Sequence, residues 1–471
     1  MLIHSMKANQ LNSFLISALT EENPFITTAE VEVWLEQQNH AVQVRIEQIA
    51  FPEMTHWNFS QDQSRLQHQS GGFFSIEGIH VRTNWREVKE WEQPIINQPE
   101  IGYLGIITKE FNGILYFLLQ AKIEPGNINY VQLSPTLQAT RSNYSQVHGG
   151  KAPAYLEYFK DRKRAAILMD QLQSEQGARF LRKRNRNIII QVTEAIEVQE
   201  AFIWLTLGQI KKLILKDNLV NMDTRTVISG IPFKSFEDIG LFSYNHNPVK
   251  MSMLISSVGK GISIYSFEEL VAWLTALKCR YELIVTGIPL NQVKKWTITD
   301  REIIEEEGRF FKVIAARVTI SNREVSSWCQ PLVKPAQDGL IAFVVKEIFG
   351  VLHFLVQAKL ECGNFDILEL APTVQCLTGD YKRPEYEIPF LDLVLEASPE
   401  SIRYDAMQSE EGGRFYQEQN RNRIVQVGAE FPIEVPENYT WMTLNQMNTF
   451  ITFNNYLNIQ ARSLISAVNF L

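Results

Sequence analysis

The sequence predicts an α+β fold built as a tandem duplication of one unit. The chain has 471 residues, which is enough for two or three domains. Short runs rich in β-branched and aromatic residues occur together with segments of helical periodicity, which indicates a mixed architecture. Three blocks recur at offsets of 235 to 237 residues: 120–144 with 357–381 (11 of 25 identical), 173–192 with 408–427 (12 of 20) and 204–229 with 441–466 (10 of 26).

The repeated blocks predict two domains joined by a connecting segment. We expect a first unit at residues 1–230, a connection at 231–261 and a second unit at 262–471. The connection contains Pro and Asn residues that favour turns, and its apolar content predicts that it packs against the domains. Because the period is too long for a solenoid, two similar domains with two similar pockets are expected.

A helix is predicted at the start of each unit, because apolar residues recur at helical spacing in residues 13–36 and 266–277. Ser266 is a suitable N-cap. Strands are predicted where short apolar runs are bounded by Gly, Asn or Pro: residues 73–81, 101–108, 115–121, 188–192, 310–320, 340–345 and 351–358. Residues 110–113 and 347–350 predict hairpin turns, and the first contains an Asn-Gly pair suited to positive φ. These elements predict an α+β sandwich in each unit.

The composition argues against several classes of protein. With 45 Lys and Arg against 53 Asp and Glu, the net charge is −8, so a general nucleic-acid or anionic-membrane binder is not expected. The four cysteines match neither a zinc site nor a disulfide framework, which favours a reducing cytosol. The N-terminus lacks the pattern of a signal peptide, and no apolar run is long enough to span a membrane.

No sharply diagnostic cofactor, metal or nucleophile motif occurs, so polar residues that recur in both units are the candidates for a site. Gln120 and Lys122 recur as Gln357 and Lys359 at the ends of predicted strands. Residues two apart on a strand share a face, so each pair could hold a phosphate or a sugar hydroxyl. The alternative is that these side chains extend into solvent at the end of the sheet.

A repeated proline turn follows each of these strands. Ser134, Thr136 and Gln138 flank the turn in the first unit, and Thr373 and Gln375 flank it in the second. Proline fixes the turn and leaves hydroxyl and amide groups beside it, which suits recognition of a sugar or a base. A purely structural turn explains the pattern equally well.

Asn-Arg-Asn triplets centred on Arg186 and Arg421 are retained, although the basic run that precedes the first triplet is replaced in the second unit. A guanidinium can hold phosphate through two parallel hydrogen bonds, so these arginines are predicted to clamp a pyrophosphate. The alternative is a buried structural arginine paired with Glu175 or Glu410.

The same repeated segment contains Arg179 and Arg414, which could contact the same ligand. Trp91 and Trp328 each precede a Gln-Pro turn. Either tryptophan could stack on a base, although aromatic residues at strand spacing belong more often to a core.

Tyrosine and histidine residues are the remaining candidates. Tyr144 and Tyr381 end the first repeated block and could stack on a base or donate a hydrogen bond. His68 and His148 differ from their counterparts in the second unit, so they could act as acid or base near neutral pH. The alternative for each is an ordinary surface histidine.

These strings resemble the NDP-hexose 2,3-dehydratase family over nearly the whole chain. The resemblance rests on His-x-Ser-Gly-x-Phe-Phe at 68–74, Trp-x-Gln-Pro-x-Ile-x-Gln-Pro-Glu at 91–100, Gln-Ala-Lys-x-Glu-Pro-Gly-Asn at 120–127, Leu-Ser-Pro-Thr-x-Gln-Ala-Thr-Arg-Ser-Asn-Tyr at 133–144 and Gln-Ser-Glu-Gln-Gly at 173–177. The second unit adds matches at 369–376, 408–415 and 458–463.

The resemblance implies two Nudix-like α+β units, a homodimer and a dTDP-4-keto-6-deoxyhexose substrate. The glutamate-rich Nudix box is missing from the sequence, so no metal or other cofactor is expected. The implied reaction removes the proton on sugar carbon 3 and the 2-hydroxyl, which gives a 3,4-diketo-2,6-dideoxy sugar for a downstream 3-ketoreductase.

The resemblance also separates binding residues from catalytic ones. Residue types shared by both units are expected to bind the nucleotide sugar, and the first unit is expected to be catalytic through His68, Tyr144, His148 and Glu175, although the shared Glu410 could equally serve. A non-catalytic sensor of nucleotide sugars is the alternative. The expected binding residues are Gln120, Lys122, Ser134, Thr136, Gln138, Arg141, Asn143, Arg179, Arg186, Trp91, Gln357, Lys359, Thr373, Gln375, Tyr381, Glu410, Arg414, Arg421 and Trp328.

Overall fold

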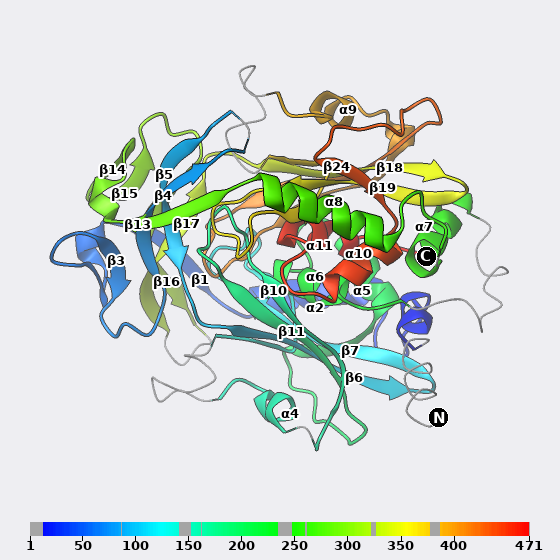
Figure 1. The fold of residues 1–471 in the computed structure, drawn as a ribbon. Helices are drawn as coiled ribbons and strands as arrows, with labels where there is room; N and C mark the ends of the chain where they lie inside the picture. The colour runs from blue at the N-terminus through cyan, green and yellow to red at the C-terminus, as the bar shows by residue number, and fades with distance from the viewer. Residues whose placement is uncertain are drawn as a thin grey trace.

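The computed structural model describes residues 13–85, 87–140, 152–161, 163–233, 247–259, 261–321, 326–376 and 387–470. It has two similar halves of mixed strands and helices, which confirms the predicted α+β duplication (Figure 1). The strands of the first half are β1 (Val44–Ile49), β2 (Trp57–Phe59), β3 (Arg65–His68), β4 (Ser75–Thr83), β5 (Glu90–Asn97), β6 (Gly102–Phe111), β7 (Ile114–Ile123), β8 (Val131–Ser134), β9 (Leu137–Ala139), β10 (Ala166–Ser174), β11 (Arg184–Gln191) and β12 (Phe202–Thr206).

The second half repeats this series of strands. They are β13 (Leu283–Ile288), β14 (Trp296–Ile298), β15 (Glu302–Glu305), β16 (Phe311–Ile320), β17 (Ser327–Pro335), β18 (Gly339–Ile348), β19 (Val351–Lys359), β20 (Glu369–Ala371), β21 (Val374–Cys376), β22 (Ile402–Ser409), β23 (Gln419–Val427) and β24 (Tyr439–Met442). The α-helices are α2 (Thr28–His40), α4 (Leu156–Lys160), α5 (Leu207–Ile214), α6 (Met222–Ser229), α7 (Pro248–Val258), α8 (Phe267–Arg280), α9 (Leu391–Leu395), α10 (Leu444–Ile451) and α11 (Ile459–Ser466), and the 3₁₀ turns are η1 (Phe51–Glu53), η3 (Leu290–Gln292) and η4 (Pro399–Ser401).

The large sheets of the two halves have the same strand order. It is β10-β11-β6-β7-β12 in the first half and β22-β23-β18-β19-β24 in the second, with two short strands added to each. The hairpins predicted at 110–113 and 347–350 join β6 to β7 and β18 to β19. Asn112 and Gly113 have φ values of 52° and 81°, which confirms the positive φ expected for the Asn-Gly pair.

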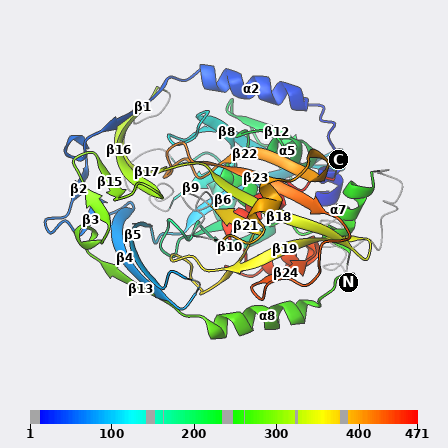
Figure 2. The same cartoon turned by 90° about the horizontal axis from the view of Figure 1, so that it is seen from above.

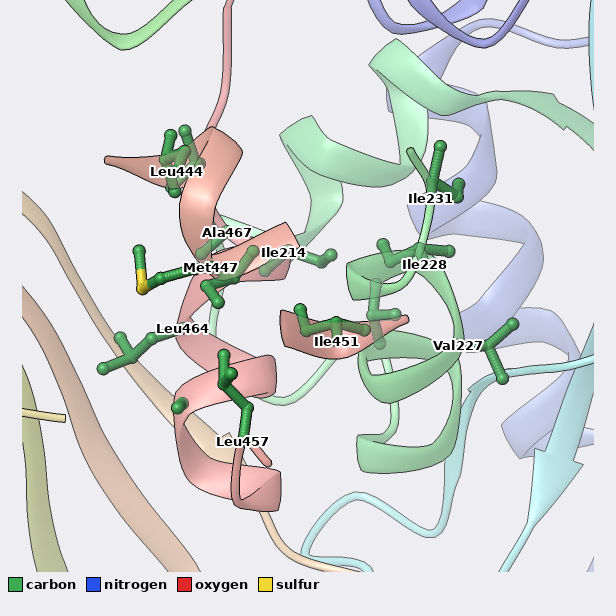
Figure 3. Packing of buried hydrophobic residues seen from close by; sticks show 14 of the residues in the cluster. Ile214, Val227, Ile228, Ile231, Leu444, Met447, Ile451, Leu457, Leu464 and Ala467 are labelled. Atoms are coloured by element: carbon green, nitrogen blue, oxygen red, sulfur yellow. The ribbon is translucent and has the colours of Figure 1, made fainter. Parts of the chain in front are cut away.

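Four short helices lie between the two large sheets (Figure 1). Thr206, Asn221, Thr443 and Asn458 cap α5, α6, α10 and α11 by accepting hydrogen bonds from backbone N–H groups of the first turn. Apolar side chains of these helices form one core that both halves share, as Figure 3 shows for Ile214, Val227 and Ile228 beside Met447, Ile451 and Leu464. The halves are therefore joined through their centre.

The two small sheets are built from strands of both halves. β1 pairs with β16, with Val44 opposite Ile320, and β13 pairs with β4, with Leu283 opposite Thr83. The preceding helices α2 and α8 lie on opposite sides of the molecule, and β1 and β13 lead from them to the end that holds the small sheets (Figure 2). Each half thus gives one strand to the other, and the expectation of a self-contained sandwich in each unit is wrong for the small sheets.

The helix predicted at residues 13–36 is interrupted. Residues 13–18 are helical and α2 begins at Thr28. Pro24 separates the two helices because proline lacks a backbone donor and restricts the residue before it. Thr27 then starts α2 by accepting a hydrogen bond from the Glu30 backbone N–H. The helix predicted at 266–277 is confirmed as α8, with Ser266 as its N-cap.

The predicted connecting segment contains the counterpart of the first helix. Ser17 Oγ donates to Leu115 O, and Ser256 Oγ of α7 donates to the equivalent Leu352 O, both at 2.5 Å. Met253 of α7 is buried in the core, so this part of the segment packs as predicted. No helix in the described part of the chain combines the length and the apolar character that a membrane span needs.

Candidate functional site

Two large cavities are lined by equivalent residues of the two halves. The first cavity has a volume of about 850 Å³ and contains Lys122 and Gln138. The second cavity has a volume of about 1250 Å³ and contains the equivalent Lys359 and Gln375. The two similar pockets expected from the duplication are therefore present, and the structure brings these four predicted residues to them.

Each cavity also receives residues from the opposite half. In the first cavity, Trp57 and Phe74 of the first half lie with Trp328 and Arg414 of the second. The reciprocal arrangement in the second cavity combines Trp296 and Phe311 with Trp91 and Arg179. Four of the predicted residues, Trp91, Arg179, Trp328 and Arg414, thus line a cavity, but each lines the cavity of the other unit.

The repeated Trp-x-Gln motif positions the cavity arginine. Trp328 Nε1 donates to Gln330 Oε1 at 2.8 Å, and Gln330 Nε2 donates to Gly413 O at 2.7 Å. Arg414 Nη1 donates to the same carbonyl at 2.8 Å, and its guanidinium lies 4.2 Å from the ring centre of Phe74. The same arrangement recurs in the second cavity with Trp91, Gln93, Ala178, Arg179 and Phe311.

The repeated lysines do not extend into solvent. The Lys122 side chain is 19% exposed, and its Nζ donates to Gln138 O at 3.4 Å and lies 3.9 Å from Glu124 Oε1. Lys359 Nζ donates to Gln375 O at 3.1 Å. Gln357 also lines the second cavity, whereas Gln120 is not among the described residues that line the first.

The hydroxyl groups of the proline turns are structural. Thr136 Oγ1 accepts from the backbone N–H of Ile107 at 2.9 Å and donates to Leu118 O, and Thr373 makes the equivalent bonds in the second half. Ser134 donates to Gln138 Oε1 at 2.6 Å. These three side chains are buried and tie strands together, so the structural alternative applies to them and the expected ligand contacts do not.

The expected pyrophosphate clamp is corrected by the structure. Arg186 forms a two-point ion pair with Asp170 on the neighbouring strand, and Arg421 forms the same pair with Asp405, with closest distances of 2.5 and 2.7 Å. Neither arginine is among the described residues that line the cavities. The buried partners expected for them, Glu175 and Glu410, are instead held by the first asparagine of each triplet.

Asn185 Nδ2 donates to Glu175 Oε2 at 2.7 Å, and Asn420 Nδ2 donates to Glu410 Oε1 at 2.5 Å. Glu175 lines the first cavity, whereas Glu410 is buried and lies outside the described lining of both cavities. The first asparagine of each triplet therefore positions the acidic residue, and the arginine stabilises the sheet.

Glu175 belongs to a group of carboxyl groups in the first cavity, together with Asp223 and Glu411. Glu175 and Asp223 are buried, and Glu411 is half-buried with its Oε2 atom buried. Burial raises the pKa of Glu175 and of Glu411 to about 7, and it raises the pKa of Asp223 well above its ordinary value. Neighbouring carboxylates, including Glu124, raise the pKa of Asp223 and Glu411 further. Groups with such pKa values can exchange protons near neutral pH, which is typical of acid–base sites.

Among the described residues, those equivalent to Glu175, Asp223 and Glu411 are not part of the lining of the second cavity. The positions equivalent to Asp223 and Glu411 hold the amides Gln460 and Gln176. Lys183, whose pKa burial lowers, lines the first cavity and is replaced by Glu418 in the second half. The sequence-based prediction missed Asp223, Glu411 and Lys183, although a search for acids that become amides between the repeats would have found the first two.

His68 also lines the first cavity, where its ring packs against Phe73 with ring centres 4.5 Å apart. The Ser70 backbone N–H donates to Nδ1 at 3.2 Å, so neutral His68 carries its proton on Nε2. The equivalent Glu305 in the second cavity is paired with Arg309 at 3.2 Å. Other predicted site residues lie outside the described part of the chain: Arg141, Asn143, Tyr144, His148 and Tyr381.

Two glycines allow the halves to interlock beside the first cavity. The backbone N–H of Gly126 donates to Gly412 O at 2.7 Å. A Cβ atom on Gly126 would lie 1.6 Å from Phe415 O, and one on Gly412 would lie 2.2 Å from Asn127 Oδ1. Because no side chain fits, both repeated motifs that contain these residues require glycine. Gly363 and Gly177 make the equivalent contact.

The fold and the cavities define a duplicated α+β protein with one cavity equipped for acid–base chemistry and a second, related cavity whose described lining lacks the equivalents of these acids. The chain belongs to the NDP-hexose 2,3-dehydratase family. The family model matches residues 28–231 and 267–468, one match in each half.

Three relatives match over almost their whole length, and each is named dTDP-4-dehydro-6-deoxy-alpha-D-glucopyranose 2,3-dehydratase. The protein from Saccharopolyspora spinosa is 46% identical over 464 residues, which cover 98% of this chain and 95% of that protein. The protein from Amycolatopsis orientalis is 41% identical over 461 residues, or 96% and 93% of the two chains. The protein from Streptomyces violaceoruber is 41% identical over 448 residues, or 94% and 97%.

Proposed function

We propose that the protein is a dTDP-4-dehydro-6-deoxy-α-D-glucopyranose 2,3-dehydratase that acts in the first cavity. The observation that carries the choice of cavity is the presence there of Asp223 and Glu411, each of which is replaced by an amide at the equivalent position of the other half, Gln460 and Gln176. The shared name of the relatives supports the substrate, and it favours an enzyme over a non-catalytic sensor.

The reaction is an elimination of water from carbons 2 and 3 of the sugar. The ketone at carbon 4 acidifies the proton on carbon 3, a base removes that proton, and the electron pair forms the double bond to carbon 2. The bond from carbon 2 to its hydroxyl breaks as an acid protonates the leaving oxygen. The enol that results tautomerises to a 3,4-diketo-2,6-dideoxy sugar.

The buried carboxyl groups supply the proton transfers in this proposal. An ionised member of the group formed by Glu175, Asp223 and Glu411 takes the proton from carbon 3, and a protonated member gives a proton to the departing hydroxyl. His68 donates from Nε2 to the carbon 4 oxygen as negative charge develops there. Tyr144 and His148 stay candidates for the same proton transfers.

Cationic and aromatic residues of the first cavity suit the nucleotide. Lys122 and Arg414 provide positive charge for the diphosphate, and the guanidinium of Arg414 is fixed by its contact with Phe74. Trp328 offers a ring face for the base. Binding of the nucleotide far from the reacting carbons holds the hexose against the carboxyl groups.

The test is incubation with dTDP-4-dehydro-6-deoxy-α-D-glucopyranose, followed by mass spectrometry for the loss of one water. We expect dehydration by the wild type, a loss of at least about a hundredfold in kcat for Glu175→Gln, and a much smaller loss for the equivalent Glu410→Gln. Binding of the substrate without a change in mass would support the sensor. Equal losses from both variants would contradict a single active cavity.

The family resemblance supports several finer proposals. The enzyme is a hydro-lyase that needs no metal, its two halves derive from Nudix-like units, and it works in the cytoplasm as a homodimer. Because a 1,2-diketone is reactive, a 3-ketoreductase takes up the product.

A further inference from the structure

Two equivalent arginines are buried where the two halves meet. Arg225 of α6 and Arg462 of α11 are each 1% exposed. Their helices pack against each other in the shared core (Figure 3). A buried guanidinium has lost its hydration, so its hydrogen-bond acceptors must be supplied by the protein. These acceptors show which parts of the chain each arginine holds.

Arg462 reaches from the second half into the first. Its Nε donates to Thr226 Oγ1 at 2.9 Å, its Nη1 donates to Gln173 Oε1 at 3.0 Å, and its Nη2 donates to Ser174 O. Ser174 is the last residue of β10, and the next residue is Glu175. A side chain of the second half thus fixes the backbone directly before an acid of the first cavity.

Arg462 also acts on the charge of this acid. Its guanidinium favours the ionised carboxylate, so it holds the pKa of Glu175 below the value that burial alone would give. Local support comes from Asn185, which donates to the carboxylate, and from the Glu175 backbone N–H, which donates to Lys183 O at 2.9 Å. The second half also holds the two neighbouring residues, because Ser174 Oγ donates to Glu369 and Gln176 Nε2 donates to Glu410. Arg462 is the cation that the second half adds to this support.

Arg225 provides an internal contrast. It donates to Ser463 Oγ at 2.5 Å and to Ser409 O, so it holds the turn that begins with Glu410. Its Nε has no hydrogen-bond acceptor among the described residues. Gln408, the equivalent of Gln173, donates to Ile214 O just as Gln173 donates to Ile451 O, but its Oε1 accepts no hydrogen bond among the described residues, whereas Gln173 Oε1 accepts from Arg462. Arg225 therefore makes fewer hydrogen bonds than Arg462. The acid next to its acceptor Ser409 is Glu410, which lies outside the described lining of the cavities.

We infer that Arg462 is a positioning residue for Glu175, so that proton transfer in the first cavity depends on a side chain of the second half. The inference rests on the proposed function. It predicts that changes at Arg462 alter kcat and its pH dependence more than they alter KM, because the arginine acts on the acid and not on the nucleotide.

The experiment measures kcat and KM as functions of pH with dTDP-4-dehydro-6-deoxy-α-D-glucopyranose. We expect kcat to fall about ten- to a hundredfold in Arg462→Lys and Arg462→Gln, with KM changed less than about threefold. In Arg462→Gln the acidic limb of the profile moves up by about one pH unit, because the lost positive charge raises the pKa of Glu175. Arg225→Lys, the matched control, leaves this limb in place.

A milder pair of variants covers the case in which the Arg462 variants do not fold. Thr226→Val removes the acceptor of Nε and lowers kcat in the same direction, whereas Thr226→Ser keeps the hydroxyl and restores the wild-type value. Circular dichroism and thermal unfolding establish that each variant is folded.

Two results would overturn the inference. One is a folded Arg462→Lys whose kcat and pH profile match the wild type, even if it is less stable. The other is identical behaviour of Thr226→Val and Thr226→Ser. Glu175→Gln measured in parallel separates the two proposals: if it is inactive while the Arg462 variants are unaffected, only the inference fails, and if it is fully active, the catalytic role of Glu175 fails as well.

Discussion

Glu369→Gln is expected to stabilise the protein. Glu369 is 1% exposed and accepts a hydrogen bond from Ser174 Oγ at 2.8 Å. At the equivalent position of the first half, Gln132 accepts the same bond from Ser409 Oγ at 2.8 Å. A glutamine therefore fits this site and keeps its hydrogen bond, while the cost of burying an ionisable group disappears.

The magnitude follows from the pKa of the carboxyl group. Burial raises the pKa of Glu369 from 4.5 to about 8. The pKa of Glu369 is thus higher in the folded state than in the unfolded state. The stability that the protonated carboxyl group provides is therefore complete below pH 4.5 and is lost as the pH rises through 8. At about 1.4 kcal/mol for each pKa unit, the gain from glutamine is under about 1 kcal/mol at pH 5, about 3 kcal/mol at pH 7 and about 5 kcal/mol at pH 9.

Urea unfolding of wild type and Glu369→Gln at these three pH values measures the gain. The reverse change, Gln132→Glu, serves as the matched control and is expected to lower the free energy of unfolding by a similar amount at pH 7. A gain that does not change with pH would refute the reasoning, because the effect would then come from packing and not from ionisation.

Four other predictions concern the cavities and the interlock of the halves. Asp223→Asn lowers kcat by about a hundredfold or more in the dehydration assay, because an amide cannot transfer the proton, and wild-type activity would contradict its role. Wild-type kcat rises as the pH passes about 7, where the base ionises, and a profile that is flat between pH 6 and 8 would contradict a base with the pKa of Glu175. Gly126→Ala lowers the free energy of unfolding by about 3 kcal/mol or more, because its Cβ would overlap a backbone carbonyl, whereas Gly113→Ala, in an open turn, costs only about 1 kcal/mol of backbone strain. Arg186→Lys changes the unfolding free energy by about 1 kcal/mol or less and leaves KM unchanged, and a large rise in KM would return this residue to the nucleotide site.

Local sequence patterns predicted the elements, and the duplication predicted the pair of cavities. The Asn112-Gly113 turn and the strands on either side of it depend on residues that are close in sequence, so their positions were predictable. The partner of a strand is a long-range property. No local pattern in residues 44–49 indicates that β1 pairs with β16 of the other half. The exchange of strands between the halves was therefore not predicted.

The same distinction holds for the site. Lys122 was predictable because a polar residue recurs at the end of an apolar strand. Arg186 recurs equally well, but its partner Asp170 also recurs as Asp405, which marks a structural pair. Asp223 was missed because differences between the repeats were considered only for histidines, whereas an acid confined to one cavity also shows as a difference.

The crossing of β1 and β13 has a consequence for the history of this architecture. A single ancestral unit would have carried one strand, the counterpart of β1 and β13, without a sheet to join. Its small sheet would have had an unpaired edge, and pairing with a second copy would have filled both positions. Fusing two such chains end to end keeps every crossed strand in place at no loss of contact. After such a fusion neither copy can be deleted, yet one of the two cavities is released from selection for the original chemistry.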